Sequence, residues 1–481
     1  MNVILHLGLG SFHRAHQAVY LQQLIDAGDR SWTLAGGNLR PDNADTIAAL
    51  QRQGGQYTLE TVAPDGKRQY QKISSITSIV PYQSGLAPLI QIGANANTRI
   101  VSFTVTEAGY YLDADHRLNL AHADLAADIE RAIESGAQKP NEGTNERTGE
   151  STRASGAGMT IYGALTAILR ARMRAQAGKL TLLNCDNLRH NGKRSRSGLL
   201  QYIALIGDPQ LAKWVEANTT SPNAMVDRIT PRPAPDVRAR VKLATGIDDE
   251  AALMGESFIQ WVIEDSFCNG RPAWERVGAQ LVATVEPYEE AKIRILNASH
   301  SCIAWAGTLV GYEFIHQGTH DARIRQFAHD YVTNDVIPCL TPSPLDLAAY
   351  RDVVLDRFGN EAIRDTNQRV AMDGFSKIPG FIAPTIRERL AHAESIASVA
   401  VLPALFLRFL KRWHHGQLPY EYQDQSMDRA AAHAICVASD PIQAFCASTV
   451  LWGAQAGDAR LTTALRQAHS QVLSFLAGHD A

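Results

Sequence analysis

"NVILHLGLGSFHRAH" (residues 2–16) holds the strongest indication of fold in the chain. Its first six residues are a short apolar run, which predicts a buried strand. Directly after this run, Gly8-x-Gly10 opens a dinucleotide-binding fingerprint: the first glycine makes a tight turn, and the second lets the backbone approach a pyrophosphate. His13 stands where a third glycine or alanine usually lies. The stretch is therefore either a nucleotide loop with one substitution or an ordinary strand–helix turn.

The surrounding segments favour the nucleotide loop. Residues 15–28 have helical spacing of apolar side chains, and residues 31–37 and 98–107 read as further strands. This rhythm of strand, helix and strand favours a parallel sheet with right-handed crossovers. Residues 57–73 instead predict two strands around an Asp-Gly turn. We predict an α/β fold, with a Rossmann-type, doubly wound, dinucleotide-binding domain over residues 1–285.

The spacing of apolar residues along the chain changes at about residue 286. Helical periodicity dominates from there, which predicts a mostly α-helical substrate and catalytic domain over residues 286–481. Residues 134–158 are polar and almost free of large apolar groups, so they cannot bury enough surface to offset their ordering entropy. We therefore predict a mobile insertion there rather than a domain boundary.

Composition narrows the class of protein. A chain of 481 residues with 45% hydrophobic and 20% charged residues suits two domains with large cores. The net charge of −3 and the lack of a basic block argue against a nucleic-acid partner.

The apolar residues 293–312 contain Arg294, Asn297 and His300, which argues against a membrane span. A strand at residue 2 leaves no room for a signal peptide. Six scattered cysteines indicate reduced thiols, and we expect a cytoplasmic monomer or weak homo-oligomer.

Several residues of the N-terminal half are candidates for cofactor binding. Asp42, the nearest acid after the second strand, could bind the adenosine ribose or be an exposed residue of a helical turn. Arg40 could accept a 2′-phosphate instead. Thr106 and Glu107 end a strand at the sheet edge where a nicotinamide would lie. The expected cofactor-binding residues are Gly8, Gly10, Phe12, His13, Arg40, Asp42, Thr106 and Glu107.

"PYEEAKIRILNASHSC" (287–302) is the candidate catalytic stretch. Its proline and first-turn glutamates are helix start signals. At about 100° per residue, Glu289, Lys292, Asn297 and His300 share one side of an otherwise apolar helix. Burial would lower the pKa of a lysine, so Lys292 is a candidate general base. Asn297 and His300 could donate hydrogen bonds to an oxygen that gains charge, and Glu289 could pass protons to solvent.

Other interpretations of these side chains remain open. The four side chains could instead satisfy one another's hydrogen bonds in a polar contact between helices. Tyr288-x-x-x-Lys292 also has the spacing of the Tyr/Lys pair of short-chain dehydrogenases, but it lies too late in the chain and follows a different glycine spacing. We expect no metal site, because His13 and His16 have no partners at ligand spacing and neither does "WHH" at 413–415.

The spacing Lys292-x-x-x-x-Asn297-x-x-His300 resembles the signature of the mannitol dehydrogenase family, the long-chain polyol dehydrogenases. The resemblance covers essentially the whole chain apart from the insertion. Five further stretches resemble blocks of that family: "GLGSFHRAHQAVYL" (8–21), "FTVTEAGYY" (103–111), "NCDNLRHNG" (184–192), "MVDRITPRP" (225–233) and "NQRVAMDGFSKIP" (367–379).

The resemblance implies roles for particular residues. It implies that histidine at the third fingerprint position belongs to the family's own cofactor loop and that NAD is the cofactor. It makes Lys292 the general base, with Asn187 and Asn297 holding the reacting oxygen and His300 orienting the substrate hydroxyl. The residues implied to bind more distant hydroxyls, each of which could also be a turn or surface charge, are Asp227, Arg369 and Lys377.

The resemblance also implies an activity, the reversible NAD-dependent oxidation of a polyol at one secondary hydroxyl. The wording of "KIRILNASHSCIAWAGTL" (292–309) and "YVTNDVIPCL" (331–340) favours D-arabinitol, oxidised to D-xylulose. A mannitol–fructose pair remains an alternative. So does a sugar acid such as fructuronate or tagaturonate, anchored by Arg369 and Lys377. A nucleotide-sensing protein without catalysis is a different class, against which the buried base argues.

Overall fold

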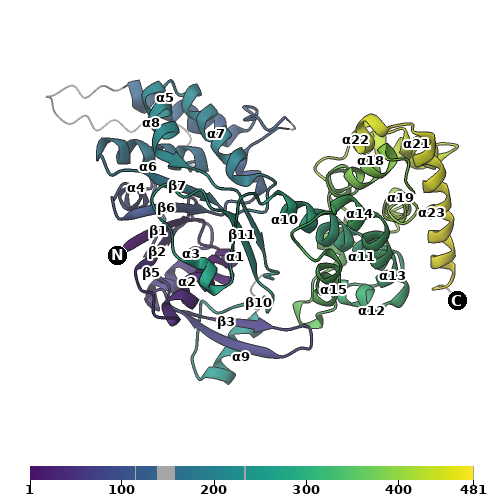
Figure 1. The fold of residues 1–481 in the computed structure, drawn as a ribbon, viewed down its shortest axis with the longest axis horizontal. Helices are drawn as coiled ribbons and strands as arrows, with labels where there is room; N and C mark the ends of the chain where they lie inside the picture. Colours follow the sequence, from purple (N-terminus) through teal and green to yellow (C-terminus); the bar gives the residue numbers. More distant parts are fainter. Residues whose placement is uncertain (114, 138–157, 232–234, 480–481) are drawn as a thin grey trace. The chain divides into compact units, whose positions relative to one another are not determined.

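The computed structural model describes residues 1–113, 115–137, 158–231 and 235–479. Contacts divide the chain into two units, one of Met1–Thr61 with Arg68–Val285 and one of Val62–Lys67 with Glu286–Ala481 (Figure 1). Most of the predicted insertion lies outside the described residues. Its predicted start at residue 134 was too early, because helix α5 (Ala123–Ala137) continues past that point.

A six-stranded parallel sheet forms the centre of the N-terminal unit, in the order β5-β2-β1-β6-β7-β8. The order runs outward from β1 in both directions and reverses between β1 and β6, which confirms the doubly wound topology. In such sheets the ligand crevice lies outside the carboxyl ends of the strands at this reversal. The strands are β1 (Asn2–Leu7), β2 (Trp32–Gly37), β5 (Ile76–Val80), β6 (Thr98–Phe103), β7 (Leu180–Asn184) and β8 (Thr219–Thr220).

Alternate side chains of β1 enter two separate cores. Ile4 packs in the core that includes α2, whereas Leu5 and Leu7 pack in the core that includes α6. Figure 1 shows these helices on opposite faces of the sheet. Each fully buried aliphatic side chain contributes roughly 1.5–3 kcal/mol, which explains why strands covered on both faces are apolar throughout. The helices of this unit, besides α5, are α1 (Ser11–Ala15), α2 (Gln17–Asp26), α3 (Ala44–Arg52), α4 (Ala87–Gly93), α6 (Ile161–Arg174), α7 (Asn191–Leu205), α8 (Pro209–Asn218) and α9 (Pro235–Thr245).

The predicted hairpin around the Asp-Gly turn is present. It consists of β3 (Tyr57–Val62) and β4 (Arg68–Ile73), and β10 (Leu253–Glu256) joins them in a three-stranded sheet. The turn Val62–Lys67 groups with the C-terminal unit, where Asn360 Nδ2 donates to the carbonyl oxygen of Val62 at 3.2 Å. A second small sheet contains β9 (Ala224–Asp227), β11 (Gln260–Glu264) and β12 (Gln280–Val282).

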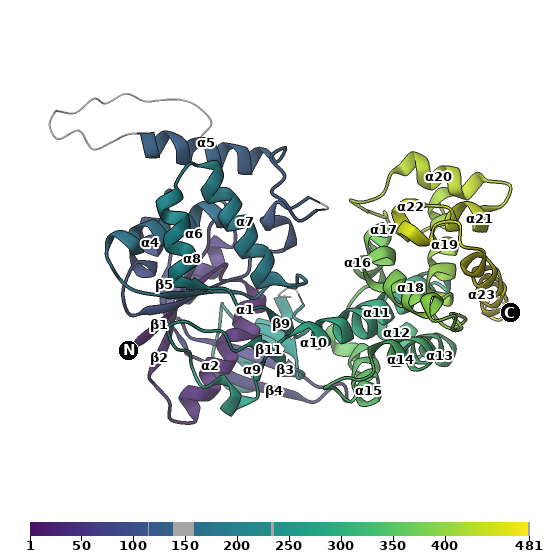
Figure 2. The ribbon, with the colours of Figure 1, turned by 45° about the horizontal axis from the view of Figure 1, so that its top comes forward.

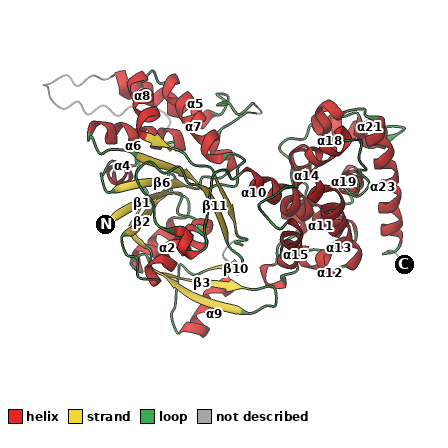
Figure 3. Ribbon diagram, in the orientation of Figure 1, coloured by secondary structure: helices red, strands yellow, loops and turns green. Residues whose placement is uncertain are grey.

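From Glu286 onward the described chain is built of helices, as predicted (Figure 3). Helix α11 (Ala298–Leu309) is fully buried over most of its length and packs against α12, α13, α16 and α19 (Figure 2). The other α-helices are α10 (Glu286–Ala291), α12 (Ile315–His320), α13 (Ala322–Tyr331), α14 (Ile337–Leu340), α15 (Leu347–Phe358), α16 (Asn367–Ala371), α17 (Gly374–Lys377), α18 (Ala383–Ala391), α19 (Val401–His414), α20 (Arg429–Val437), α21 (Pro441–Cys446), α22 (Thr449–Trp452) and α23 (Ala459–Ala477).

The candidate catalytic stretch is not one uninterrupted α-helix. A π-helical segment, Lys292–Asn297, separates α10 from α11. Two further π-helical segments, Val332–Val336 and Ile378–Ile382, pack against it. The i→i+5 bonds of a π-helix make a wider turn than those of an α-helix. The prediction of α-helical geometry was therefore wrong here, and angles of about 100° per residue do not apply across this segment.

Within the described ranges, no helix combines the length and apolar character needed to cross a membrane. All six cysteines are free.

Candidate active site

The loop between β1 and α1 crosses the carboxyl edge of the sheet. Gly8 has φ +101°, and a Cβ atom there would lie 2.0 Å from the carbonyl oxygen of Thr104, so only glycine fits. A Cβ atom at Gly10 would have its nearest neighbour 3.9 Å away, which leaves this backbone open to a ligand. The N–H of Leu9 donates to Oδ1 of Asn38 at 2.7 Å and ties the loop to the end of β2. The loop fits the pyrophosphate of a dinucleotide.

His13 packs inside this unit. Its side chain has no exposed area, and its ring stacks on His6 with centroids 3.4 Å apart. The His6 ring lies 2.9 Å from Oγ of Ser102, and burial lowers its pKa to about 3. Burial also lowers the pKa of His13 well below its usual value. His13 therefore joins the loop to the sheet, and the cofactor contact that we predicted for it stays a prediction. Phe12 stacks on His16, with centroids 5.0 Å apart.

The segment after β2 holds the two residues expected to select between NAD and NADP. Asp42 is exposed. Arg40 already has partners, because its Nη2 lies 2.6 Å from Oδ2 of Asp124 and donates to the Tyr111 hydroxyl at 2.8 Å. The Asp124 carboxylate therefore balances part of the positive charge that a 2′-phosphate would use.

Thr106 follows β6 at the carboxyl edge with φ +67° and ψ 160°, a conformation that only glycine adopts readily. The buried carboxylate of Asp186 holds it there, accepting the N–H of Val105 at 2.8 Å and that of Thr106 at 3.0 Å. The Tyr110 hydroxyl also donates to this carboxylate. Asn187, the next residue in the chain, is exposed beyond the end of β7. Sequence reasoning missed Asp186, although an acid directly after a buried strand was a usable signal.

The remaining predicted residues of the N-terminal unit lie at strand or loop ends. Glu107 is exposed at the start of a short 3₁₀ helix, and Asp227 ends β9 with 5% exposure. Asp227 and Arg228 are not an exposed turn pair. The Arg228 side chain is buried and donates to the carbonyl oxygens of Glu256 at 2.9 Å and Ala15 at 2.6 Å.

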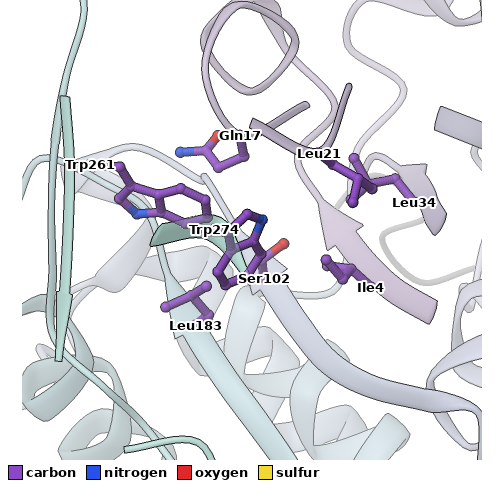
Figure 4. A pocket seen from close by; sticks show the side chains of 8 residues that line it. All are labelled: Ile4, Gln17, Leu21, Leu34, Ser102, Leu183, Trp261 and Trp274. Atoms are coloured by element: carbon purple, nitrogen blue, oxygen red, sulfur yellow. The ribbon is translucent and has the colours of Figure 1, made fainter. Parts of the chain in front are cut away.

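A small cavity also lies in the N-terminal unit, against the face of the sheet that α2 covers (Figure 4). Its volume is about 10 Å³, room for about one water molecule, and its lining is mostly apolar. Its position in the core separates it from the loops at the carboxyl edge, so we assign it no part in substrate binding. The lining residues are Ile4, Gln17, Leu21, Leu34, Ser102, Leu183, Trp261 and Trp274.

In the C-terminal unit, the candidate base is buried. Glu289 and Lys292 expose 5% and 7% of their surface, and Asn297 is half-buried at the end of the π-helical segment. Arg294, between them, has a structural role. Its guanidinium binds both carboxylate oxygens of Glu388, at 2.8 and 2.7 Å.

His300 lies in a cluster of charged side chains. Its ring stacks on Phe358 with centroids 4.3 Å apart, and its Nε2 lies 3.3 Å from Oδ2 of Asp365. Nε of Arg369 donates to the other oxygen of Asp365 at 2.6 Å, and Nη2 of Arg369 contacts Oδ2. Burial raises the pKa of Asp365, but the contacts with His300 and Arg369 outweigh it and hold this pKa below its usual value. Burial lowers the pKa of His300, which Asp365 opposes.

Lys377 belongs to the same cluster. Its Nζ donates to the carbonyl oxygen of Val370 at 2.5 Å, and burial lowers its pKa to about 8. Arg369 and Lys377 both act electrostatically on His300. The structure therefore brings three predicted residues together around Asp365, which sequence reasoning missed. The available signal was the spacing of four between Asp365 and Arg369, typical of an ion pair on a helix.

In the described part of the chain, no group of three or more His, Cys, Asp or Glu side chains is arranged to hold a metal ion.

Each of the two units is similar to a domain of known proteins. The mannitol dehydrogenase Rossmann domain matches residues 2–276 and the mannitol dehydrogenase C-terminal domain matches residues 284–473. The D-arabinitol 4-dehydrogenase of Ralstonia nicotianae is 56% identical over 99% of this chain and 97% of its own length. That of Klebsiella pneumoniae is 50% identical over 98% of both chains. The solved mannitol 2-dehydrogenase of Pseudomonas fluorescens, a ternary complex with NAD and D-mannitol, is 32% identical over 99% of this chain and 94% of its own, with a TM-score of 0.80. The chain therefore belongs to the mannitol dehydrogenase family.

Proposed function

We propose that this protein oxidises D-arabinitol to D-xylulose with NAD, reversibly. The observation that carries the proposal is the identity of 56% and 50%, over nearly the full chain, to two relatives named D-arabinitol 4-dehydrogenase. Lys292 and Asn297 on the π-helical segment and His300 on α11 support catalysis rather than cofactor sensing alone.

The chemistry divides between the cofactor and the chain. NAD, when bound, supplies the hydride acceptor. Lys292 accepts the proton of the reacting hydroxyl, and its burial excludes the water that would otherwise solvate its charge. Asn187 and Asn297 donate hydrogen bonds to the reacting oxygen. Glu289 passes the proton on to solvent.

The other hydroxyls of the polyol bind to Asp227, His300, Arg369 and Lys377. With a pKa of about 8, Lys377 is mostly protonated at pH 7 and donates hydrogen bonds from an ammonium group. Gly8 makes the tight turn, the open backbone at Gly10 approaches the pyrophosphate, and Thr106 and Glu107 flank the nicotinamide.

We propose NAD rather than NADP as the preferred cofactor. A 2′-phosphate needs a free cationic partner, whereas the Arg40 guanidinium is bound to Asp124 and Tyr111. The exposed carboxylate of Asp42 suits ribose hydroxyls and repels a phosphate. The free cysteines are in keeping with a reducing, cytoplasmic location. For assembly we propose a monomer or weak homo-oligomer, which gel filtration would test.

Mannitol is the second candidate substrate, favoured by the structural likeness to a mannitol 2-dehydrogenase. A sugar acid fits less well. Its carboxylate would need an unbalanced cation, and because Asp365 pairs with the guanidinium of Arg369, only Lys377 of the two expected anchors is left to supply one.

The test is a polyol panel assayed by NADH absorbance with purified protein. D-arabinitol, mannitol, xylitol, sorbitol and L-arabinitol are compared by kcat/KM, and the D-arabinitol product is identified by chromatography. We expect the highest kcat/KM for D-arabinitol and D-xylulose as its product. A higher kcat/KM for mannitol would replace D-arabinitol by the second candidate, and no turnover with any polyol would contradict both.

A further inference from the structure

The carboxylate of Asp365 contacts two side chains that the proposed function assigns to the substrate. One oxygen lies 3.3 Å from Nε2 of His300, within ion-pair distance but outside hydrogen-bond geometry, and the other accepts from Nε of Arg369 at 2.6 Å. The side chain of Asp365 is 8% exposed, so solvent does little to screen it.

The backbone around Asp365 is fixed independently of this ion pair. Its carbonyl oxygen accepts the N–H of Ile315 at 2.9 Å, and Phe314 and Thr366 form a β-bridge. Oγ1 of Thr366 then caps α16 by accepting the N–H of Arg369 at 3.3 Å. The carboxylate is therefore placed by its own main chain rather than by its partners.

This placement bears on the protonation of His300. An ionised carboxylate only accepts hydrogen bonds, so the ring nitrogen that faces it is stabilised in the N–H form. In a neutral imidazole the other nitrogen, Nδ1, then carries a lone pair. The stack on Phe358 restrains the ring plane. His300 would thus accept a hydrogen bond from a substrate hydroxyl, whereas the sequence suggested that it donates one.

We propose that Asp365 is a positioning residue, which keeps the neutral His300 protonated at Nε2 so that Nδ1 accepts a hydrogen bond from a polyol hydroxyl, and which holds the guanidinium of Arg369 beside it. The proposal rests on the proposed function, because that function places His300 and Arg369 at the polyol. Asp365 itself need not touch the substrate.

The test uses the full-length protein and Asp365→Asn, which keeps the side-chain size and removes the charge. We expect kcat/KM for the preferred polyol to fall about 10- to 100-fold, by analogy with the loss of an outer hydrogen-bond partner of a metal-binding histidine. The Kd for NAD should stay within a factor of two of wild type, on the order of experimental variation in such comparisons.

A spectroscopic readout separates positioning from general loss of structure. In protein labelled with ¹⁵N-histidine, the His300 signal is identified by its loss in His300→Gln. We expect wild type to show Nε2–H with an unprotonated Nδ1 and Asp365→Asn to show a mixture of tautomers. This measurement on wild type tests the proposal even if Asp365→Asn does not fold.

Asp321→Asn is the matched control, because Oδ2 of Asp321 forms another, partly buried Asp–His contact in the described part of this unit, 2.7 Å from Nε2 of His479. It should lower the melting temperature and leave kcat/KM unchanged. Wild-type kcat/KM in Asp365→Asn, or a proton on Nδ1 of His300 in wild type, would overturn the proposal. Full turnover in His300→Ala would instead contradict the role that the proposed function gives His300, so the two failures are distinguishable.

Discussion

The N–H of Thr106 lies 3.0 Å from Oδ1 of Asp186, and this bond holds a threonine in a backbone conformation that costs on the order of 1–3 kcal/mol. The neighbouring N–H of Val105 binds the second oxygen of the same carboxylate. Such strain persists only where several contacts enforce it. It lies at the carboxyl edge of β6, where the proposed function places the nicotinamide.

Asp186→Asn should therefore relax this turn. We expect a rise in the Kd for NAD of about 10-fold or more, because an amide cannot accept both N–H groups as a carboxylate does, and a charge-assisted hydrogen bond contributes roughly 1.5–3 kcal/mol. Fluorescence titration with NAD measures this change. Adding Thr106→Gly to Asp186→Asn should restore part of the affinity, since glycine adopts φ +67° without strain. An unchanged Kd in Asp186→Asn would show that the turn does not depend on this carboxylate.

Lys292→Ala should lower kcat for polyol oxidation about 10²- to 10⁴-fold, the usual contribution of a positioned general base. NAD affinity should stay near wild type, because Lys292 lies outside the nucleotide-binding unit. Steady-state kinetics and NAD titration measure the two effects. Lys213→Ala, at an exposed position of α8, is the control and should change neither. Normal turnover in Lys292→Ala would remove this lysine from the mechanism.

Asp124→Asn should increase kcat/KM with NADP several-fold and leave kcat/KM with NAD nearly unchanged. The substitution removes the charge that Arg40 now binds at 2.6 Å and leaves the guanidinium to a 2′-phosphate. Asp42→Ala should also increase kcat/KM with NADP, because it removes a carboxylate that repels this phosphate. The comparison is kcat/KM for both cofactors in the three proteins. A wild type that already prefers NADP would contradict our interpretation of this loop.

The pKa of Lys377, lowered by burial to about 8, predicts that KM for the polyol rises several-fold between pH 7 and 9.5 as the ammonium loses its proton. In Lys377→Arg the charge persists over this range, so KM should stay flat even if it is higher throughout. Because the folded-state pKa lies below the ordinary value of 10.5, the unfolded chain binds the proton more tightly, and this group makes stability increase from about pH 8 to 10.5. Deprotonation of Lys377 therefore does not unfold the protein, so unfolding cannot be the cause of the rise in KM. A parallel rise in Lys377→Arg would assign it to another group.

Local patterns were sufficient to predict the fold. Gly8 needs a positive φ and Gly10 an open backbone, and both requirements act within a few residues of β1. The switch to helices at residue 286 likewise follows from periodicity within single segments. The catalytic and binding roles of Lys292 and its neighbours stay predictions.

What the sequence could not supply were partners from distant segments. Asp186 binds the N–H of a residue 80 positions away, a contact that exists only once β6 and β7 are neighbours. Asp365 meets His300 because α16 packs on α11. His13 stood out by its place in the fingerprint, but its stack on His6 depends on how the loop folds back over β1.

The wide turn of the π-helical segment Lys292–Asn297 affects the direction in which the side chains before and after it face. This turn accommodates one residue more than an α-helical turn does, so if it closed to α-helical geometry with no residue removed, His300 would rotate by about 100° relative to Lys292. Both residues would remain in the sequence, yet the base and the histidine would face different neighbours. Activity among related chains can therefore depend on the shape of this one turn, with every polar side chain of the site intact.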